Sequence, residues 1–285
     1  MIRTDADSLA RHLAEDLGIQ KGDLVFVFSG IWGFGHLTNG LDDISNAFRA
    51  VIPDGLLIVP TFTYSWCDNE PWDITRTECP DMGAYSNHAW QQADFRRSDN
   101  PNFSVAALET KHNQALIDDL FDTDDSCFGE RSVFGNILRH GRERRAWILL
   151  LGGAFKDCLF RCTFIHYSQQ KVNVPYRFEK TFADPEGSDR EVSQLVRYLS
   201  EEEYLAVNGH PAEGFGFPVE EDFGLFGEDL YREGRLIRSD FAYYESRMVS
   251  VADCCDFFEE KALDDPFYCL PDSSDQAAVN PAGRE

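Results

Sequence analysis

Continuous apolar runs mark the expected strands of this chain. Three such runs lie between glycines, turns or polar residues, at positions 24–28, 56–60 and 147–151. A strand with one face in water alternates apolar and polar side chains, so these runs predict strands buried on both faces. A shorter run at 105–108 predicts a fourth strand. The run at 147–151 ends in Gly152 and Gly153, and glycine at a strand end lets a second backbone or a ligand come close.

Helical spacing occupies the segments between these runs. Leu9, Leu13 and Leu17 recur at every fourth position, which predicts an amphipathic helix over residues 6–17. Ser132 is the expected N-cap of a second helix. Further helical patterns lie around residues 44–51, within 82–95, and at 112–121 and 249–263. Strand, glycine-rich loop and helix near the N-terminus follow the order of a βα unit.

The length and composition allow a full hydrophobic core. The chain has 285 residues, of which 43% are hydrophobic, so we expect a single domain over residues 1–270 followed by a polar, disordered tail at 271–285. No stretch of eighteen apolar residues occurs, and the charged N-terminus has no apolar signal core. We therefore expect a cytoplasmic protein without a membrane partner.

The charge balance narrows the choice of partners. The formal net charge is -24, from 50 acidic and 26 basic side chains, which disfavours nucleic acid because phosphate binding requires a positive surface. A negative field concentrates positively charged substrates such as amines, although solubility alone explains the excess equally well.

The eight cysteines do not form a recognisable framework. With no oxidising compartment indicated, we expect free thiols. Cys158 and Cys162 are four residues apart, but no second Cys/His pair follows at metal-ligand spacing, so no metal is expected. A nucleophilic cysteine, Cys67 or Cys127, remains an alternative for the chemistry, although no activating partner is identifiable by spacing.

Two loops are candidates for function. The segment from 65 to 102 is a long surface excursion whose aromatic residues, Trp66, Trp72, Tyr85 and Trp90, either line a pocket or pin the loop to the core. The loop Gly33-Phe34-Gly35 places free backbone amides near a strand end, which suits a phosphate or thioester oxygen. It lacks the spacing of a dinucleotide or ATP motif.

His166 is the best candidate for acid–base chemistry. It follows the buried strand and the glycine pair, and clefts of α/β proteins open at the carboxyl ends of parallel strands. Imidazole has an ordinary pKa near neutral pH, which suits a general base. The alternative is a hydrogen-bonded core histidine.

Five short motifs in order resemble the aminoglycoside 3-N-acetyltransferase family, over roughly residues 5–265. They are FSGI at 28–31, VPT at 59–61, Arg97-Ser98 with Pro101 and Ser104, FGERS at 128–132, and Leu151-Gly152 followed by TFIH at 163–166. The VPYR segment at 174–177 is more similar to members found beside sugar and antibiotic biosynthesis than to drug-resistance members.

This resemblance implies an α/β fold, a three-layer α/β/α sandwich with a largely parallel or mixed central sheet and a loop-rich C-terminal half. It implies transfer of an acyl group from acetyl-CoA or another acyl-CoA to a primary amine. The expected acceptor is an amino sugar, an aminoglycoside-like compound or a biosynthetic intermediate. We expect a monomer or a homodimer.

The resemblance also assigns expected roles to residues. His166 falls where the family's histidine acts as base, with Gln169 to orient it and the amides near Ser29 and Gly30 as donors to the thioester oxygen. The expected cofactor contacts are Ser29, Gly30, Ile31, Thr61 and Ser104, and the expected substrate contacts are Tyr64, Asn100 and Glu130.

Two positions depart from the family pattern. Gln169 stands where the family commonly has a glutamate, and a neutral amide stabilises an imidazolium less than a carboxylate does. Asp99, Glu130 or Asp157 would have to supply the charge. Asn100 stands where drug-modifying members have a histidine, although Asn-Pro is also a common turn. The alternative function is a degenerate member that binds CoA or a sugar-like ligand without efficient transfer.

Overall fold

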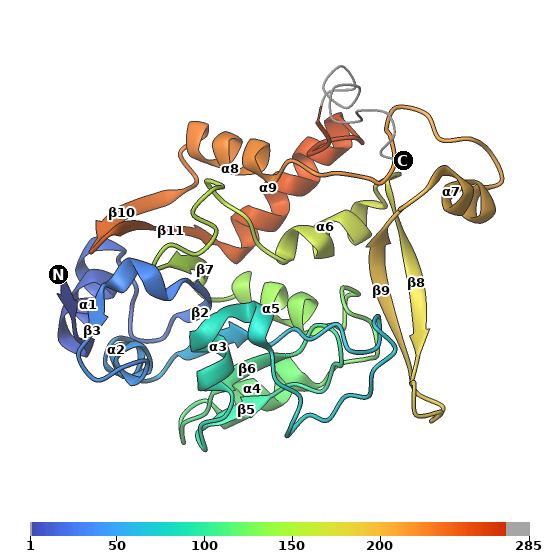
Figure 1. Cartoon of the computed structure of the whole chain (residues 1–285). Helices are drawn as coiled ribbons and strands as arrows, with labels where there is room; N and C mark the ends of the chain where they lie inside the picture. Colours follow the sequence, from blue (N-terminus) through green and yellow to red (C-terminus); the bar gives the residue numbers. More distant parts are fainter. Residues whose placement is uncertain (1, 272–285) are drawn as a thin grey trace, which may run out of the picture.

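A seven-stranded mixed sheet forms the centre of the protein (Figure 1). The computed structural model describes residues 2–271. Three strands run parallel in the middle of the sheet, β2 (Leu24–Ser29), β4 (Leu56–Pro60) and β7 (Ala146–Leu151). They coincide with the three continuous apolar runs, which confirms that prediction. The outer strands pair antiparallel: β5 (Phe95–Arg97), β6 (Val105–Leu108), β10 (Ile237–Phe241) and β11 (Tyr244–Ser250).

Both faces of the sheet are covered by helices, so the α/β prediction of three layers is confirmed. Val25 and Val27 pack toward α1 (Ala6–Arg11) and α2 (Asp42–Val51), whereas Phe26 and Phe28 pack in the opposite core. Alternate residues of one strand point to opposite faces, which is why central strands need apolar residues at every position. Helix α3 (Gly83–Ala89) lies with α1 and α2, and the other face carries α4 (Gln114–Phe121), α5 (Val133–Gly141), α6 (Phe164–Val172) and α9 (Val251–Asp264).

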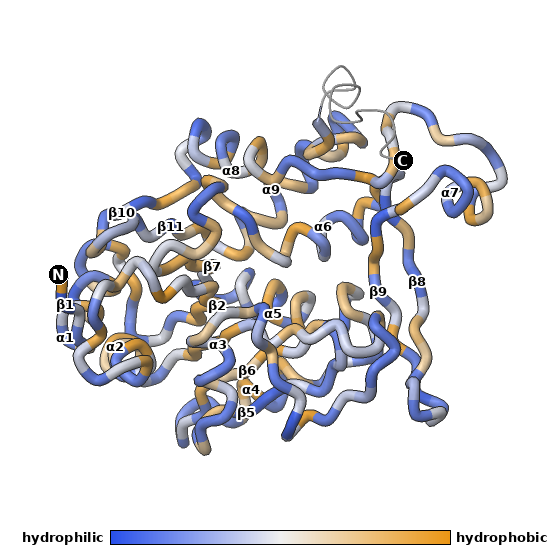
Figure 2. The backbone as a smooth tube through the Cα atoms, in the orientation of Figure 1, coloured by the Kyte–Doolittle hydropathy of each residue, from blue (hydrophilic) through white to orange (hydrophobic). Residues whose placement is uncertain are grey.

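A separate hairpin stands beside this sandwich. Strands β8 (Arg177–Ala183) and β9 (Glu191–Arg197) pair with each other and with no other strand, and α7 (Glu201–Asn208) follows them (Figure 1). Helix α8 (Phe223–Arg232) then returns to pack on α9. The short strands β1 (Arg3–Thr4) and β3 (His36–Leu37) form a further pair near the N-terminus. Figure 2 shows the hydrophobic positions gathered along β2 and β7, with the outer loops hydrophilic.

Local sequence signals explain where several helices begin. The Ser132 hydroxyl accepts a hydrogen bond of 3.2 Å from the Gly135 amide, so the predicted N-cap of α5 is confirmed. The predicted helix over residues 6–17 is α1 continued by a π-helical turn, His12–Asp16. The helical pattern within 82–95 yields only α3, because the chain bends into β5 at Phe95.

The described residues show no helix long and apolar enough to cross a membrane. The predicted polar tail, apart from Pro271, lies outside the described residues.

A glycine contact joins the loops after β2 and β7. The Gly33 amide donates to the Gly152 carbonyl at 3.0 Å, and the Gly30 amide donates to the Leu151 carbonyl at 2.9 Å. A Cβ atom built on Gly33 would lie 2.4 Å from the Gly152 carbonyl carbon. Gly152 itself has a φ of +62°, which favours glycine. The two loops therefore lie in direct backbone contact, without intervening side chains.

Substitution of Gly33 by alanine is expected to destabilise the protein by about 1–3 kcal/mol, because the new methyl group overlaps backbone that has no room to move. The matched control is Gly22→Ala, since a Cβ at Gly22 meets no atom within 4 Å. Urea unfolding of both variants measures the difference. Equal unfolding midpoints for the two variants would show that the close contact is not rigid.

Candidate functional site

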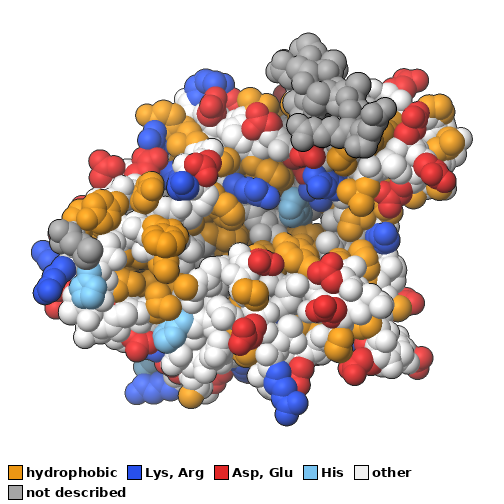
Figure 3. Space-filling model, viewed as in Figure 1, with side chains coloured by type: hydrophobic (Ala, Val, Ile, Leu, Met, Phe, Trp, Pro, Cys, Tyr) orange, Lys and Arg blue, Asp and Glu red, His pale blue; other side chains and the backbone are white. Residues whose placement is uncertain are grey.

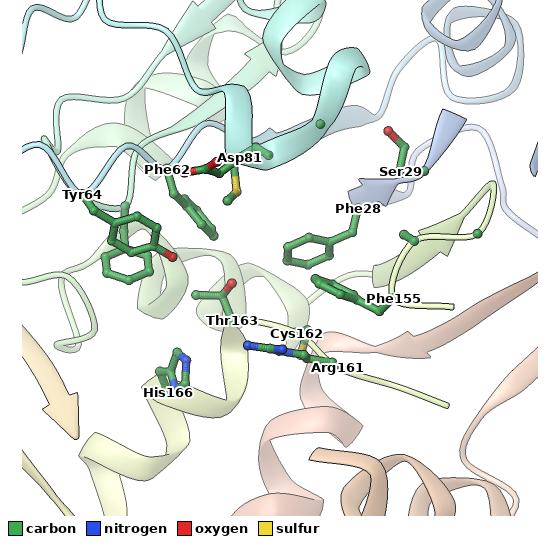
Figure 4. Close-up of a pocket in the computed structure, with 16 residues that line it drawn as sticks. Phe28, Ser29, Phe62, Tyr64, Asp81, Phe155, Arg161, Cys162, Thr163 and His166 are labelled. Atoms are coloured by element: carbon green, nitrogen blue, oxygen red, sulfur yellow. The ribbon is translucent and has the colours of Figure 1, made fainter. Parts of the chain in front are cut away.

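The carboxyl ends of the parallel strands open into a cavity of about 350 Å³. Residues from the ends of β2 and β7 and from the start of α6 form its wall, as expected for an α/β sheet. Figure 3 shows the hollow on the surface, and Figure 4 shows the side chains that face it. We call this the first cavity. Its lining includes Phe28, Ser29, Tyr64, Phe155, Arg161, Thr163 and His166.

A second cavity, of about 580 Å³, lies against the β8–β9 hairpin. It shares Tyr64, Phe103 and His166 with the first cavity. His166 is therefore located where the two cavities meet. A group at this position can contact a ligand in either cavity.

The start of α6 fixes the position of His166. The helix begins after Thr163, and the His166 ring packs edge-on against Phe128 and Phe223, with ring centroids 5.6 and 5.9 Å away. Its Nδ1 lies 2.8 Å from Oε1 of Gln169, one turn further along the helix. The ring is partly buried and held on three sides.

A chain of hydrogen bonds determines which nitrogen of His166 carries the proton. The Tyr176 hydroxyl donates to the Tyr268 carbonyl at 2.9 Å, so its oxygen accepts from Gln169 Nε2 at 3.2 Å. The second Nε2 hydrogen of Gln169 is directed at the Glu221 carboxylate. Both donors of the amide are thereby used, so Oε1 must accept from His166 Nδ1. The remaining nitrogen, Nε2, holds the free lone pair.

The electrostatics keep this imidazole neutral. Burial lowers the pKa of His166 to about 4, and the Arg177 guanidinium adds to the shift, while Glu221 opposes it. Burial alone would raise the pKa of Glu221, but its contacts with Arg177 and its proximity to His166 lower the value below the ordinary one. Glu221 is consequently ionised, and it supplies the negative charge behind Gln169.

Glu221 is the residue that sequence reasoning missed. Of the three acidic residues considered for this charge, Asp99 pairs with Arg190, and Glu130 and Asp157 are exposed, outside the two cavities. Glu221 lies 52 residues beyond Gln169 in a loop without periodic pattern. No spacing rule in the sequence links the two positions.

Two polar side chains at the end of β2 and before α6 lack hydrogen-bond or ion-pair partners among the described residues. The Ser29 hydroxyl is buried without a hydrogen-bond partner, but its oxygen is closed off from the cavity space. The Arg161 guanidinium packs on the rings of Phe155 and Phe223, 5.6 and 5.0 Å from their centroids, and has no ion-pair partner within residues 2–271. The Gly30 amide, which was expected to donate to the thioester oxygen, already donates to the Leu151 carbonyl. It is therefore not free to bind a ligand.

The family model of aminoglycoside 3-N-acetyltransferases matches residues 26–262 of this chain. The chain belongs to the aminoglycoside 3-N-acetyltransferase family. The predicted N-acetyltransferase relationship, with CoA as co-substrate, is thus confirmed at the level of the family.

The individual members of this family that match the chain have low sequence identity to it. An aminoglycoside N(3)-acetyltransferase IV from Salmonella sp is 32% identical over 107 residues, which are 37% of this chain and 40% of that protein. The apoenzyme structure of aminoglycoside acetyltransferase AAC(3)-IVa has a TM-score of 0.71 at 20% identity, covering 96% of this chain and 94% of that one. A binary structure of AAC-IIIb with CoASH has a TM-score of 0.65 at 20% identity, covering 92% and 97%.

Two of the expected cofactor contacts lie behind the cavity wall. Thr61 and Ser104 are fully buried, their hydroxyls are 2.9 Å apart, and both accept from Arg97 Nε. Neither residue lines a cavity described above. In this member of the acetyltransferase family they hold Arg97, which also stacks over Trp72 and Trp90. These two tryptophans therefore pin the 65–102 loop.

The other expected contacts divide into two groups. Ser29, Gly30 and Tyr64 line the first cavity, and burial raises the pKa of Tyr64 to about 12, so its hydroxyl stays protonated. Ile31, Asn100 and Glu130 line neither cavity. Asn100 Oδ1 accepts from the amides of residues 102 and 103 at 3.0 and 2.8 Å, which is the turn that an Asn-Pro sequence forms.

The cysteine alternative finds no electrostatic support. Burial raises the pKa of Cys67 to about 11, and burial also raises the pKa of Cys127 above its ordinary value. A nucleophilic thiol requires the opposite shift. The described residues contain no cluster of three or more potential metal ligands.

We expect His166 to remain unprotonated from pH 8 to about pH 5. Imidazole nitrogen shifts in NMR spectra measure this directly, and a His166→Gln variant assigns the signal. Because the unfolded chain takes up this proton near its ordinary pKa of about 6.5, stability contributed by the neutral ring is present above that pH and is lost as pH falls toward 4. Titration of the His166 signal between pH 6 and 7 would contradict the network described above.

Proposed function

We propose that this protein transfers an acyl group, acetyl or another, from an acyl-CoA to a primary amine, with His166 as the general base. The observation that supports the proposal is the position of His166 between two cavities, with Nε2 free and Nδ1 bonded to Gln169. One cavity suits the acyl donor, and the other suits the amine. The acceptor class expected from the family name is an amino sugar or a related compound.

The chemistry requires a base at this position. An acyl-CoA supplies an activated thioester carbonyl, whereas an amine that is to attack it must shed a proton. His166 Nε2 has the unshared pair that accepts this proton. The imidazolium that then forms is stabilised by the ionised Glu221, whose charge acts through the polarised Gln169 amide.

Residues of the first cavity fit the donor. Thr163 lies one turn before His166 and faces this cavity (Figure 4). Arg161 supplies a positive charge for the anionic part of CoA, and Phe28 and Phe155 supply apolar surface.

The competing proposal is a family member that binds ligand but no longer transfers acyl groups efficiently. The substitution at Gln169 and the low pKa of His166 favour it, because both weaken the base. The charge of Glu221 favours the proposal of an active enzyme, because it stabilises the imidazolium. The two variant series below separate these possibilities.

His166→Ala is expected to lower the rate of thiol release from acetyl-CoA by at least about 100-fold, the usual contribution of a general base. A thiol-detecting assay with a panel of amino sugars measures the rate, and calorimetry with CoA verifies that binding is retained. The control is His112→Ala, an exposed histidine outside both cavities. Equally slow thiol release by wild type and His166→Ala would refute catalysis by this residue.

A charge-swap series tests the role of Glu221. Glu221→Gln is expected to lower the rate at least about tenfold, because the imidazolium loses its nearest carboxylate. Gln169→Glu is not expected to gain activity, since it places two carboxylates in contact and one of them must take up a proton. The double variant, Gln169→Glu with Glu221→Gln, restores a single charge and is expected to recover activity.

The pH dependence of kcat/KM distinguishes an electrostatic effect of these variants from a general loss of structure. Only a change of charge near His166 moves the apparent pKa of the base. A fully active Glu221→Gln enzyme with an unchanged pH profile would remove Glu221 from the mechanism.

A further inference from the structure

The second cavity carries positive charge in a strongly acidic protein. Its lining includes Arg177, Lys180 and Arg197, all from the hairpin, and a single carboxylate, Glu203. The whole chain has a net charge of -24. Chance placement on such a chain would favour acidic side chains here. The lining of this cavity thus presents more cationic than anionic side chains, which suits an anionic group on a ligand.

The strand register places two of these charges directly opposite each other. Arg177 on β8 is the cross-strand partner of Arg197 on β9. Like charges at this position destabilise a hairpin unless anions neutralise them. Glu221 contacts Arg177, and Glu220 lies 3.5 Å from Arg197, so carboxylates from the following loop offset part of the repulsion.

The cations nearest to solvent remain available to a ligand. Lys180 is 3.9 Å from Glu203 with 48% of its side chain exposed, and Arg197 has 44% of its side chain exposed. Ion pairs of this length and exposure contribute little, so exchange for a ligand anion costs little. Arg177 is 91% buried as a side chain, yet its Nε has no hydrogen-bond partner.

We infer that the acceptor amine of this protein also bears an anionic group, a carboxylate or a phosphate, which binds to the hairpin cations of the second cavity while its amine reaches His166. This inference rests on the proposed function, because His166 marks the end of the cavity where the amine reacts. Phe182, Leu195 and Val196 supply apolar surface between the two ends. Aminoglycosides carry several positively charged amines, and these cations disfavour them.

The test compares amines that differ in charge. Glucosamine 6-phosphate tests an acceptor with a phosphate, and muramic acid tests one with a carboxylate. Glucosamine is the control without an anionic group, and sisomicin is the polycation. Acetyl transfer and calorimetric binding are measured for wild type, Lys180→Gln, Lys180→Glu and Arg197→Gln. Lys21→Glu is the matched control, because Lys21 is 68% exposed, pairs with Asp54 and lies outside the cavity.

We expect wild type to prefer at least one anionic amine over glucosamine and sisomicin. Each neutralised cation is expected to raise the KM for that amine about tenfold, the loss typical of one charged hydrogen bond. The KM for acetyl-CoA and the KM for glucosamine stay unchanged, and Lys180→Glu improves sisomicin. The ratio of the kcat/KM values for glucosamine 6-phosphate and muramic acid identifies the preferred anion.

Three outcomes overturn the inference: preference of wild type for sisomicin, an increase in the KM for acetyl-CoA in the Lys180 and Arg197 variants, or no binding of either anionic amine. An increase in the acetyl-CoA KM would assign the cations to the CoA phosphates. Failure of the proposed function is distinguishable, because thiol release would then be absent with every amine. Binding of an anionic amine that weakens in Lys180→Gln would still support the inference in that case.

Discussion

The side-chain amide of Gln169 is the contact on which the arrangement of the site depends. One end accepts from His166, and the other end donates to Tyr176 and Glu221. An amide used at all three positions cannot rotate without leaving buried groups unpaired, which is costly. Its orientation thereby fixes the tautomer of His166 and the position of the free lone pair. The neutral amide of Gln169 thus links the charge of Glu221 to the ring of His166.

This arrangement separates two tasks that a glutamate next to the histidine would combine. Gln169 orients the ring, and Glu221 supplies the charge while it also neutralises Arg177. Because Arg177 belongs to the hairpin, the electrostatics of His166 are linked to the wall of the second cavity. A ligand that changes the surroundings of Arg177 also changes the field at His166.

The regular parts of the fold were predictable from the sequence, whereas the network around His166 was not. Continuous apolar runs specify the central strands, and Ser132 marks the start of α5, because burial and capping act on neighbouring residues. The shared motifs contain His166 and Ser29, which both line the first cavity. Thr61 and Ser104 belong to the same motifs but hold Arg97 behind the wall. Glu221 contacts Gln169 only in the folded protein, because the two residues are 52 positions apart. No local sequence pattern therefore predicts this contact.

The glycine contact between the loops after β2 and β7 has an evolutionary consequence. At this contact Gly30, Gly33 and Gly152 leave no room for a Cβ atom, so amino-acid replacement has little freedom there. The hairpin wall opposite is built from side chains on a two-stranded ribbon that pairs with no other strand. Side-chain replacement can therefore change the lining of the second cavity more freely than the backbone contact beside the first cavity.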